Sequence, residues 1–360
     1  MKILYLIDHD PSLSSGVMNK IKSQVSTWVQ LGHTVSILSS STLTLYDGQF
    51  TAVDTLPRKL RGRSNRLSVA ARLMMSTFLL RKLAKHVDAD VIYMRYRLYT
   101  PRLLSLFGKR KLIMEINSDD STEYKLRSLW THFYNKATRG ILLSRVDAFV
   151  GVSEELSDRF SSPGKPCVTI ANGIDVAQHS FFNNNNTPPK LVFIGTPGQP
   201  WHGIDKVEKM AEKFQEYMFY IIGPTGKDTD NLKYLGVLPN SAANEFIRTC
   251  DIGIGSLSLH LKGLTEASPL KTRQYLASGL PIIYGYRDTD IPANSSFALE
   301  LLNCKDNLDF EAIKKFILDV VGDAHVKGTA RLFAESALAY RVKEKERISF
   351  FGKVVGASAQ

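Results

Sequence analysis

The stretch EASPLKTRQYLASGLP, residues 266–281, constrains the fold more than any other part of this sequence. Apolar runs at residues 251–255 and 281–284 predict two short buried strands on either side of it. Between these strands, Pro269 suits the first turn of a helix and Gly279 suits the position just past its end. A strand, a helix and a second strand joined in this order predict a parallel sheet with a helical crossover.

The N-terminus of this helix is a candidate anion site. It would lie at the carboxyl edge of the sheet, where free backbone N–H groups and the positive end of the helix dipole favour a negative charge. Lys271 adds a cation in the first turn, and Glu266 supplies an acid in the loop before the helix. An ordinary crossover with a capped helix is the alternative interpretation.

The same stretch resembles the nucleotide-sugar site of family 4 glycosyltransferases, which have the GT-B fold. In that family an acidic loop residue is followed eight positions later by a Glu, inside a pattern like Pro-Leu-Lys-x-x-Glu-Tyr-x-Ala-x-Gly-x-Pro. Here the position of the second Glu holds Gln274. The resemblance implies that Glu266 contacts hydroxyl groups of the donor sugar and that Gln274 faces the ribose. It also implies that the donor lies against Ser268, Pro269 and Leu270.

The exchange of Glu for Gln274 predicts weaker nucleotide binding. A Gln side chain still accepts a hydrogen bond through its carbonyl oxygen, but it carries no charge. Hydrogen bonds to charged groups contribute more than neutral ones, so we expect the affinity to fall by around a factor of ten.

The sequence predicts two α/β domains. Its 360 residues suffice for two domains of ordinary size, and the polar, Pro-terminated run at residues 183–189 has the composition of a linker. We expect an N-terminal domain at residues 1–182 and a second domain at residues 190–335. The resemblance implies two Rossmann-like parallel-sheet domains facing each other across a cleft, the first binding the acceptor and the second the nucleotide sugar. It also implies that a C-terminal helix, residues 336–360, crosses back to the N-terminal domain.

Apolar runs and helical periodicity define the elements expected in the first domain. Strands are expected at residues 2–7, 33–39, 88–94, 111–115, 146–153 and 167–170. Helices are expected at residues 17–31, 64–86 and 121–143, with a further helix capped by Ser153. Residues 40–60 are expected to be irregular. Asn172-Gly173 is expected to form a turn with positive φ, in a segment that resembles the Asn-Gly-Ile-Asp signature closing the N-terminal domain of family 4.

The same patterns define the second domain. Beyond the strands at residues 251–255 and 281–284, strands are expected at residues 191–194, 219–222 and 232–239. Helices are expected at residues 204–214, 241–249, 269–277, 310–321 and 327–351.

Polar side chains follow two strands of the first domain. Ligands in open α/β sheets bind outside the carboxyl ends of the strands, which nominates Arg95, Arg97, Glu115 and Asn117. By the resemblance these residues would face the acceptor, and structural capping is the alternative. Gly16 lies in the first loop, where a glycine lets the backbone approach a ligand closely. In family 4 that loop faces the donor phosphates.

A second loop carries further donor contacts. The segment that begins at Gly195 and ends with His202-Gly203 resembles the second donor-phosphate loop of family 4, which commonly holds an Arg and then a Lys. Thr196 and His202 stand at those two positions. A neutral His202 can donate one hydrogen bond to a phosphate, although it is a weaker anchor than a Lys. By the resemblance, Val237 and Leu238 would pack against the base.

Glycosyl transfer from a nucleotide sugar requires that the leaving diphosphate be stabilised as it gains charge. The resemblance implies that fixed dipoles and basic side chains do this in place of a metal ion. We assign Glu266 and Lys271 as catalytic residues and name no catalytic base. Neither a metal nor a cofactor is expected, because the nucleotide sugar is a co-substrate.

The net charge of +11 is concentrated in the first half of the chain. Residues 1–180 carry 25 basic and 15 acidic residues, and residues 181–360 carry 21 and 20. Much of the excess comes from Arg58, Lys59, Arg61, Arg63, Arg66, Arg72, Arg81, Lys82 and Lys85. Such a cluster suits an anionic membrane surface or another polyanion, and a solvated basic face is the alternative. The amphipathic helix at residues 64–86 could lie on a membrane or pack on the core.

Composition also indicates the cellular compartment that we expect for the protein. No apolar run of 18 or more residues occurs, and the first residues read as a strand and not as a signal peptide. The three cysteines have no metal-ligand spacing, which favours buried thiols in a reducing cytoplasm. We expect a cytoplasmic protein bound peripherally to the inner face of the membrane, with no nucleic-acid partner.

These observations predict a retaining, metal-independent glycosyltransferase. It would move a sugar from a UDP- or GDP-sugar to a glycan or lipid-linked glycan in surface polysaccharide biosynthesis. A catalytically weak or inactive GT-B partner in a glycosyltransferase complex is the alternative, because Thr196, His202 and Gln274 depart from the family pattern. A nucleotide-sugar epimerase is a further alternative, although it should need additional carboxylates or histidines.

Overall fold

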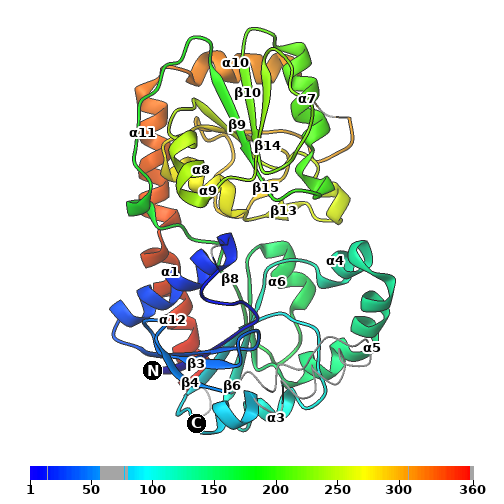
Figure 1. The fold of residues 1–360 in the computed structure, drawn as a ribbon, viewed down its shortest axis with the longest axis vertical. Coiled ribbons are helices and arrows are strands. Elements are labelled where there is room, and N and C mark those ends of the chain that lie inside the picture. The colour runs from blue at the N-terminus through cyan, green and yellow to red at the C-terminus, as the bar shows by residue number, and fades with distance from the viewer. Residues whose placement is uncertain (14, 57–76, 78–79, 307, 357–360) are drawn as a thin grey trace. The chain divides into compact units, whose positions relative to one another are not determined.

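The computed structural model describes residues 1–13, 15–56, 77, 80–306 and 308–356. The chain divides into two compact units (Figure 1). The first unit comprises Met1–Ile170 together with Glu344–Gln360, and the second comprises Ala171–Lys343. Most of the helix predicted at residues 64–86 lies outside the described residues, of which 80–85 are helical.

The first unit is built on an eight-stranded sheet with the order β4-β3-β2-β1-β5-β6-β7-β8. The strands are β1 (Lys2–Ile7), β2 (Thr34–Ser39), β3 (Thr44–Tyr46), β4 (Ala52–Thr55), β5 (Val91–Arg95), β6 (Lys111–Ile116), β7 (Ala148–Gly151) and β8 (Cys167–Thr169). Strand β1 pairs in parallel with β2 on one side and with β5 on the other. The pairs β5–β6, β6–β7 and β7–β8 are parallel as well. Their near-continuous apolar runs suit strands that are covered on both faces.

The prediction that residues 40–60 are irregular is wrong for residues 40–56, and residues 57–60 lie outside the described chain. Within residues 40–56, β3 pairs antiparallel with β2, and β4 pairs antiparallel with β3. The Asp47 carboxylate closes the turn by accepting hydrogen bonds from the backbone N–H groups of Gln49 and Thr51, at 2.9 Å each. The apolar alternation of a strand is missing because β4 is exposed along its whole length at the sheet edge.

Besides the helical residues 80–85, the described helices of the first unit are α1 (Gly16–Gln30), α3 (Leu104–Phe107), α4 (Asp120–Arg127), α5 (Leu129–Arg145), α6 (Glu154–Phe160) and most of α12 (Tyr340–Gly356). The helical region predicted at residues 121–143 consists of two helices, α4 and α5. Ser128 is extended between them, and its hydroxyl accepts a hydrogen bond from the Thr131 N–H at 3.4 Å. The prediction that Ser153 caps a helix is confirmed, because its hydroxyl accepts from the Leu156 N–H at the start of α6.

The end of α12 completes the core of the first unit. Phe350, Phe351 and Val354 belong to the apolar cluster that lies against β1 and α1. The ring centroid of Phe351 lies 5.8 Å from that of Trp28 and 5.0 Å from that of Tyr93. These contacts tie the last helix to the first strands.

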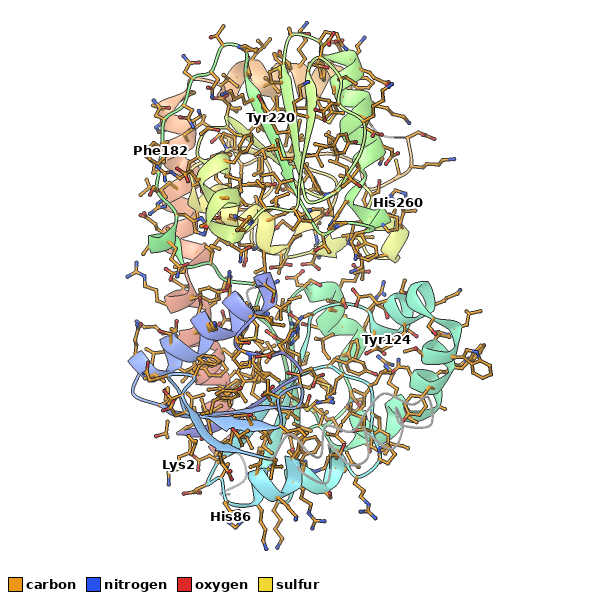
Figure 2. The ribbon with its side chains drawn as sticks, viewed as in Figure 1. Lys2, His86, Tyr124, Phe182, Tyr220 and His260 are labelled. Atoms are coloured by element: carbon orange, nitrogen blue, oxygen red, sulfur yellow. The ribbon has the colours of Figure 1, made fainter. Side chains whose placement is uncertain are left out.

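The second unit is built on a six-stranded sheet with the order β11-β10-β9-β12-β14-β16, in which every pair is parallel. The strands are β9 (Lys190–Ile194), β10 (Met218–Ile222), β11 (Leu232–Gly236), β12 (Ile252–Ile254), β14 (Ile282–Tyr284) and β16 (Ala298–Glu300). Side chains fill the space around this sheet, as at Tyr220 on β10, whose ring packs on Phe246 (Figure 2). A separate ladder joins β13 (Glu266–Ala267) to β15 (Arg287–Asp288).

Five α-helices of the described chain lie wholly in the second unit: α7 (Ile204–Lys213), α8 (Asn240–Ile247), α9 (Leu270–Ala277), α10 (Phe310–Val320) and α11 (Ala324–Phe333). The one helix predicted at residues 327–351 is wrong, because a π-helical turn, Ala334–Leu338, separates α11 from α12. Extended Ala339 marks the break, and Ile174 pairs with it as an isolated bridge. Among the described helices, none combines the length and the apolar character that crossing a bilayer requires.

The predicted positive-φ turn at Asn172-Gly173 is also wrong. Neither residue has positive φ, because the segment is held extended by other contacts. The Asn172 N–H donates to the Ser268 hydroxyl at 2.7 Å, and its side-chain amide donates to the Ser268 carbonyl at 2.5 Å. A Cβ on Gly173 would lie 2.8 Å from the ring of Tyr340, so close packing explains this glycine.

Candidate functional site

Helix α9 is fixed against the ends of the central strands of the second unit. The Tyr275 hydroxyl accepts a hydrogen bond from the Ile194 N–H, the last residue of β9, at 2.8 Å. Gly253 on β12 makes room for the Tyr275 ring, since a Cβ there would lie 2.4 Å from it. Pro269 is the N-cap just outside the helix, and Gly279 follows its end with φ +76°. The first turn of α9 is thereby held beside the carboxyl ends of β9 and β12.

Lys271 brings a cation to this first turn. Its Nζ lies 3.9 Å from the centroid of the Phe193 ring and 3.4 Å from Nδ1 of His202. Within the described part of the chain, Lys271 has no carboxylate at ion-pair distance. Burial lowers the pKa of its ammonium well below the usual range. A half-buried cation without a counter-ion favours an anionic ligand at this position.

The neighbouring His202 is neutral and has one unused donor. A protonated Lys271 can only donate to Nδ1 of His202, and in that state Nε2 carries the proton of the neutral imidazole. Nε2 is buried and makes no hydrogen bond to the described residues. Burial, followed by the charges of Lys271 and Lys262, lowers the pKa of His202 to about 2.

Glycines create the space in front of His202. A Cβ on Gly195 would lie 2.7 Å from Nε2 of His202. Gly223 is in turn confined by Gly195, because its Cβ would lie 1.7 Å from the Gly195 carbonyl oxygen. Gly203 has φ +69° and turns the chain from His202 into α7. Of the predicted donor residues, the structure thus gathers Gly195, His202, Gly203 and Lys271 in one place.

Glu266 has a different environment. It lies on β13, is buried, and accepts a hydrogen bond from the Arg287 guanidinium at 3.1 Å. No contact links its side chain to Lys271 or His202 among the interactions seen in the described residues. The structure therefore brings Lys271 and His202 together but leaves Glu266 bound to Arg287.

The remaining predicted donor residues of the second unit have separate environments. The Gln274 side-chain N–H donates to Oδ1 of Asn244 on α8, which leaves the side-chain carbonyl oxygen of Gln274 to accept. The Ser268 hydroxyl accepts from the backbone of Asn172, and Leu270 begins the helix. Thr196, Val237 and Leu238 lie on loops after β9 and β11, with Val237 75% exposed.

Sequence reasoning missed Arg273 in the same helix. Its guanidinium is fully buried and contacts both Asp288, at 2.8 Å, and Asp290, at 2.9 Å. Although burial opposes the charge, these two carboxylates raise the pKa of Arg273. Its Nε also donates to the Asn172 carbonyl at 3.3 Å. No motif or spacing signals this cluster, since its members are distant in sequence.

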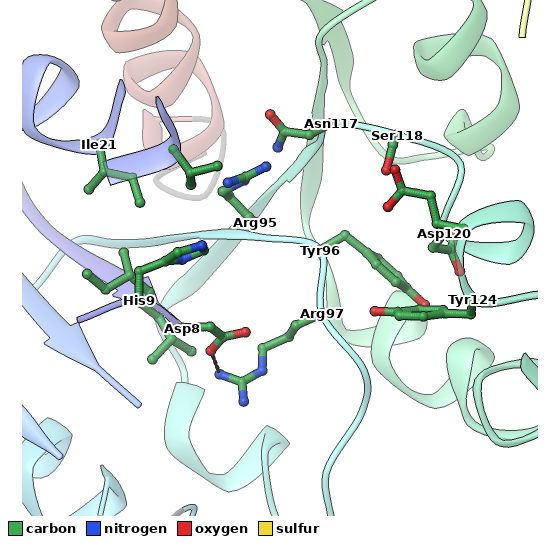
Figure 3. A pocket seen from close by; sticks show the side chains of 14 residues that line it. Asp8, His9, Ile21, Arg95, Tyr96, Arg97, Asn117, Ser118, Asp120 and Tyr124 are labelled. Atoms are coloured by element: carbon green, nitrogen blue, oxygen red, sulfur yellow. Dashed lines mark ion pairs between the residues drawn. The ribbon is translucent and has the colours of Figure 1, made fainter. Parts of the chain in front are cut away.

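In the first unit, a pocket of about 360 Å³ opens at the carboxyl ends of β1, β5 and β6. Three of the predicted acceptor residues, Arg95, Arg97 and Asn117, line it (Figure 3). Val17 and Ile21 of α1 also line it, and Gly16 is the first residue of that helix. Residues that follow the carboxyl ends of parallel strands therefore do line a pocket in the first unit.

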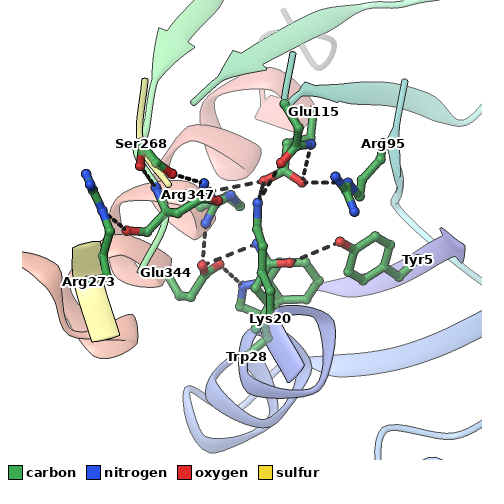
Figure 4. Close-up of polar contacts among 12 residues, drawn as sticks. Tyr5, Lys20, Trp28, Arg95, Glu115, Ser268, Arg273, Glu344 and Arg347 are labelled. Carbon is green, nitrogen blue, oxygen red and sulfur yellow. Dashed lines mark hydrogen bonds and ion pairs between the residues drawn. The ribbon is translucent and has the colours of Figure 1, made fainter. Parts of the chain in front are cut away.

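The fourth predicted acceptor residue, Glu115, does not line this pocket. It is fully buried and is surrounded by cations (Figure 4). Lys20 lies 2.8 Å from its carboxylate, Arg347 3.6 Å and Arg95 3.9 Å, and the Asn117 amide donates to it at 3.1 Å. Burial alone would raise the pKa of Glu115, but these three cations lower it to about 2. Glu115 thus contacts Arg95 and Asn117 from the buried side and holds these two pocket residues in position.

The pocket also contains residues that sequence reasoning missed. Asp8 pairs with Arg97, and His9 lies beside Arg95 (Figure 3). Burial first and then Arg95 lower the pKa of His9. Asp120 is nearly buried, and its Oδ1 makes no hydrogen bond to the described residues. Asp8 and His9 follow β1 directly, so the strand-end rule could have found them.

Comparison with known proteins places these sites in context. Residues 15–178 match the model of Glycosyltransferase Family 4, and no curated protein matches the chain. Sucrose-phosphate synthase from Thermosynechococcus elongatus has a similar structure, with a TM-score of 0.77 and 12% identity over 99% of this chain and 100% of that chain. Anabaena HepE in complex with UDP-glucose gives a TM-score of 0.68 at 12% identity, over 98% of this chain and 100% of that chain.

A more distant likeness is the pneumococcal O-GlcNAc transferase GtfA in complex with UDP and GlcNAc. It has a TM-score of 0.52 and 13% identity, over 77% of this chain and 60% of that chain. At these identities the likeness concerns the fold. It confirms the predicted α/β class with two parallel sheets of the GT-B type.

Proposed function

From the match of residues 15–178 to the model of Glycosyltransferase Family 4, we propose that the chain is a nucleotide-sugar-dependent glycosyltransferase of that family. The protein moves a sugar from a UDP- or GDP-sugar to a glycan or lipid-linked glycan. The transfer retains the anomeric configuration and uses no metal ion. The second unit binds the donor, and the first unit binds the acceptor.

The observation that carries this proposal is the cation without a counter-ion in the first turn of α9. As the glycosidic bond breaks, the diphosphate gains negative charge. Lys271, the N-terminus of α9 and the Nε2–H of His202 offer fixed positive potential next to one another. Positive groups that are already in place stabilise developing charge without reorganising, which is the electrostatic contribution that such a reaction needs.

Two features support the nature of the substrates. HepE and GtfA, which share the fold, are both known in complexes with uridine nucleotides. On the acceptor side, the pocket lined by Arg95, Arg97 and Asn117 presents cations and an amide beside the carboxylates of Asp8, Asp120 and Glu123. We propose that an acceptor hydroxyl enters there, in surface polysaccharide synthesis at the inner face of the membrane.

The test is a calorimetric titration of the full chain with UDP, GDP, ADP and CMP and their sugar conjugates. We expect one nucleotide to bind, and Lys271→Met to weaken that nucleotide at least tenfold, because charged hydrogen bonds are worth about 1.5–3 kcal/mol. Methionine keeps the stem that packs on Phe193 but removes the charge. Lys209→Ala, an exposed lysine of α7, is the matched control and should bind like the wild type. Addition of EDTA should leave the affinity unchanged.

A folded protein that binds none of these nucleotides would contradict the proposal. That outcome would favour the alternative of an inactive GT-B partner in a glycosyltransferase complex.

A further inference from the structure

Helix α5 of the first unit turns an apolar face toward solvent. The exposed fractions are 87% for Trp130, 60% for Leu129, 60% for Phe133, 45% for Ile141 and 43% for Tyr134. At about 100° per residue, these five side chains fall within one sector of about 140° on the helix. A surface helix normally places such residues against the core. A contiguous exposed apolar face therefore indicates a surface that something else covers.

The opposite side of α5 already has its partners. Asn135 and Leu142 are buried on that side, and Asn135 donates to Asp120 at 2.5 Å on the preceding helix. The helix is therefore docked by one side, and rotation of α5 cannot bury the apolar face. We call the five exposed residues Leu129, Trp130, Phe133, Tyr134 and Ile141 the α5 apolar face.

The charge around this face is positive. Helix α5 contains Lys136, Arg139 and Arg145 and no acidic residue. In the part of the chain that the structure describes, Lys136 forms no ion pair, whereas Arg139 pairs with Asp120 and Arg145 with Asp147. Anionic groups are therefore favoured beside the apolar side chains.

A pocket of about 340 Å³ lies beside the same helix. Lys136, Arg139 and Gly140 of α5 line it together with His132. The Nδ1–H of His132 donates to the Ser121 carbonyl at 3.1 Å, which fixes the ring at the pocket wall. The site can hold a phosphate group next to an apolar surface, a combination that phospholipids present.

We infer that the α5 apolar face docks on the surface of an anionic lipid bilayer. Trp130 and Phe133 enter the interface between headgroups and acyl chains, where aromatic side chains are favoured. Tyr134 lies at the edge of this contact, since its hydroxyl donates to the Tyr99 carbonyl at 2.9 Å. Lys136 and Arg139 meet lipid phosphates, because cations beside an anionic surface are attracted to it. A second copy of the chain is disfavoured as the occupant, since it would bring two cationic helices together. This inference deepens the proposed membrane contact of the first unit by giving it a defined surface.

The test is flotation of the full chain with lipid vesicles. We expect binding to phosphatidylcholine vesicles that contain 30 mol% phosphatidylglycerol, at least tenfold weaker binding to pure phosphatidylcholine, and release in 0.5 M NaCl. The double variant Trp130→Ser with Phe133→Ser should lower the partition coefficient at least tenfold. The matched control, Leu318→Ser with Leu332→Ser, removes two side chains that are 65% and 64% exposed in the second unit and should partition like the wild type.

Tryptophan fluorescence gives a second readout. Of the other two tryptophans, Trp28 is fully buried and Trp201 lies in the second unit, so a blue shift on addition of anionic vesicles that comes from Trp130 should vanish in Trp130→Phe and persist in Trp201→Phe. Equal flotation of the double variant and the wild type would overturn the inference. A double variant that still binds vesicles but has a lower Tm would also overturn the inference. That result would mean that the α5 apolar face packs within the protein. Without vesicles, the same variants should bind nucleotide with the wild-type affinity. A loss of vesicle binding can therefore be distinguished from a failure of the proposed glycosyltransferase function.

Discussion

His202 is a histidine that the second unit keeps uncharged. Its ring is buried, and Lys271 lies 3.4 Å from its Nδ1. Both features oppose protonation, which is why its pKa falls to about 2. The imidazole can therefore serve a phosphate only as a neutral hydrogen-bond donor.

The lowered pKa has a measurable cost in acid. Below the unfolded pKa of about 6.5, the unfolded chain binds a proton that the folded chain excludes, so stability falls as the pH decreases. For this one group the loss between pH 7 and pH 5 is about 2 kcal/mol. We predict that His202→Gln loses about 2 kcal/mol less than the wild type over that range. Native-state hydrogen exchange of the β9 and β12 peptides measures this difference within the second unit.

The control for this prediction is His325→Gln, which changes an exposed imidazole on α11 of the same unit. It should keep the wild-type dependence of stability on pH. A His202→Gln variant with the wild-type pH dependence would mean that His202 is protonated in the folded state.

Single residues also show where sequence reasoning ends. The position of Lys271 followed from the helix start at Pro269, since local geometry fixes which residues occupy the first turn. The burial of Glu115 did not follow, because its partners Lys20 and Arg347 lie 95 and 232 positions away in the chain. A strand-end carboxylate looks the same in sequence whether it faces a ligand or three cations.

At the scale of elements, β9 and β10 meet through two glycines with almost no space between them. Because a Cβ on Gly223 would lie 1.7 Å from the Gly195 carbonyl and its φ is +103°, no side chain fits. We predict that Gly223→Ala destabilises the second unit by more than about 3 kcal/mol, since backbone must move to admit it. Hydrogen exchange of the β9 and β10 peptides would report the loss.

Gly198 allows the strain of a positive φ to be distinguished from the steric clash of an added Cβ as the cause of the destabilisation. It also has a positive φ, +72°, but a Cβ there would meet nothing within 4 Å. Gly198→Ala should therefore cost only the conformational penalty of about 1–2 kcal/mol. If both alanine variants lose the same stability, backbone conformation and not crowding explains the Gly223 position.

The regular elements were predictable because burial on both faces leaves a local signature. Each central strand of both sheets coincides with an apolar run, and α1 and α7 end where their glycine or polar boundaries indicate. The breaks inside long helical regions were not predictable. Ser128 interrupts α4 and α5 through its own backbone, and extended Ala339 follows the π-turn because it pairs with Ile174, far away in the chain.

At the scale of the whole molecule, the first unit is assembled from two distant pieces of chain. Phe351 packs on Trp28 and Tyr93, and Glu344 accepts a hydrogen bond from the Trp28 indole at 2.7 Å. We predict that Phe351→Ala lowers the stability of the first unit by about 3–5 kcal/mol through the cavity that it leaves. Protection of the β1 and β5 peptides in hydrogen exchange should fall, whereas the β9 peptide should be unaffected.

Lys353→Ala is the neighbouring control, since this side chain is exposed on the same helix. Its effect should stay within about 0.5 kcal/mol. A loss of protection that spreads equally to β9 would show that the two units unfold as one.

The end of α12 gives the protein an unusual order of maturation. During synthesis, β1 and α1 leave the ribosome first, but Glu344 and Phe351, which close their core, are translated after the entire second unit. The second unit is contiguous and can fold while translation continues. The first unit must wait with Trp28 and Tyr93 uncovered, so a ribosome that stalls before residue 344 releases a chain whose exposed aromatic core marks it for chaperones and proteases.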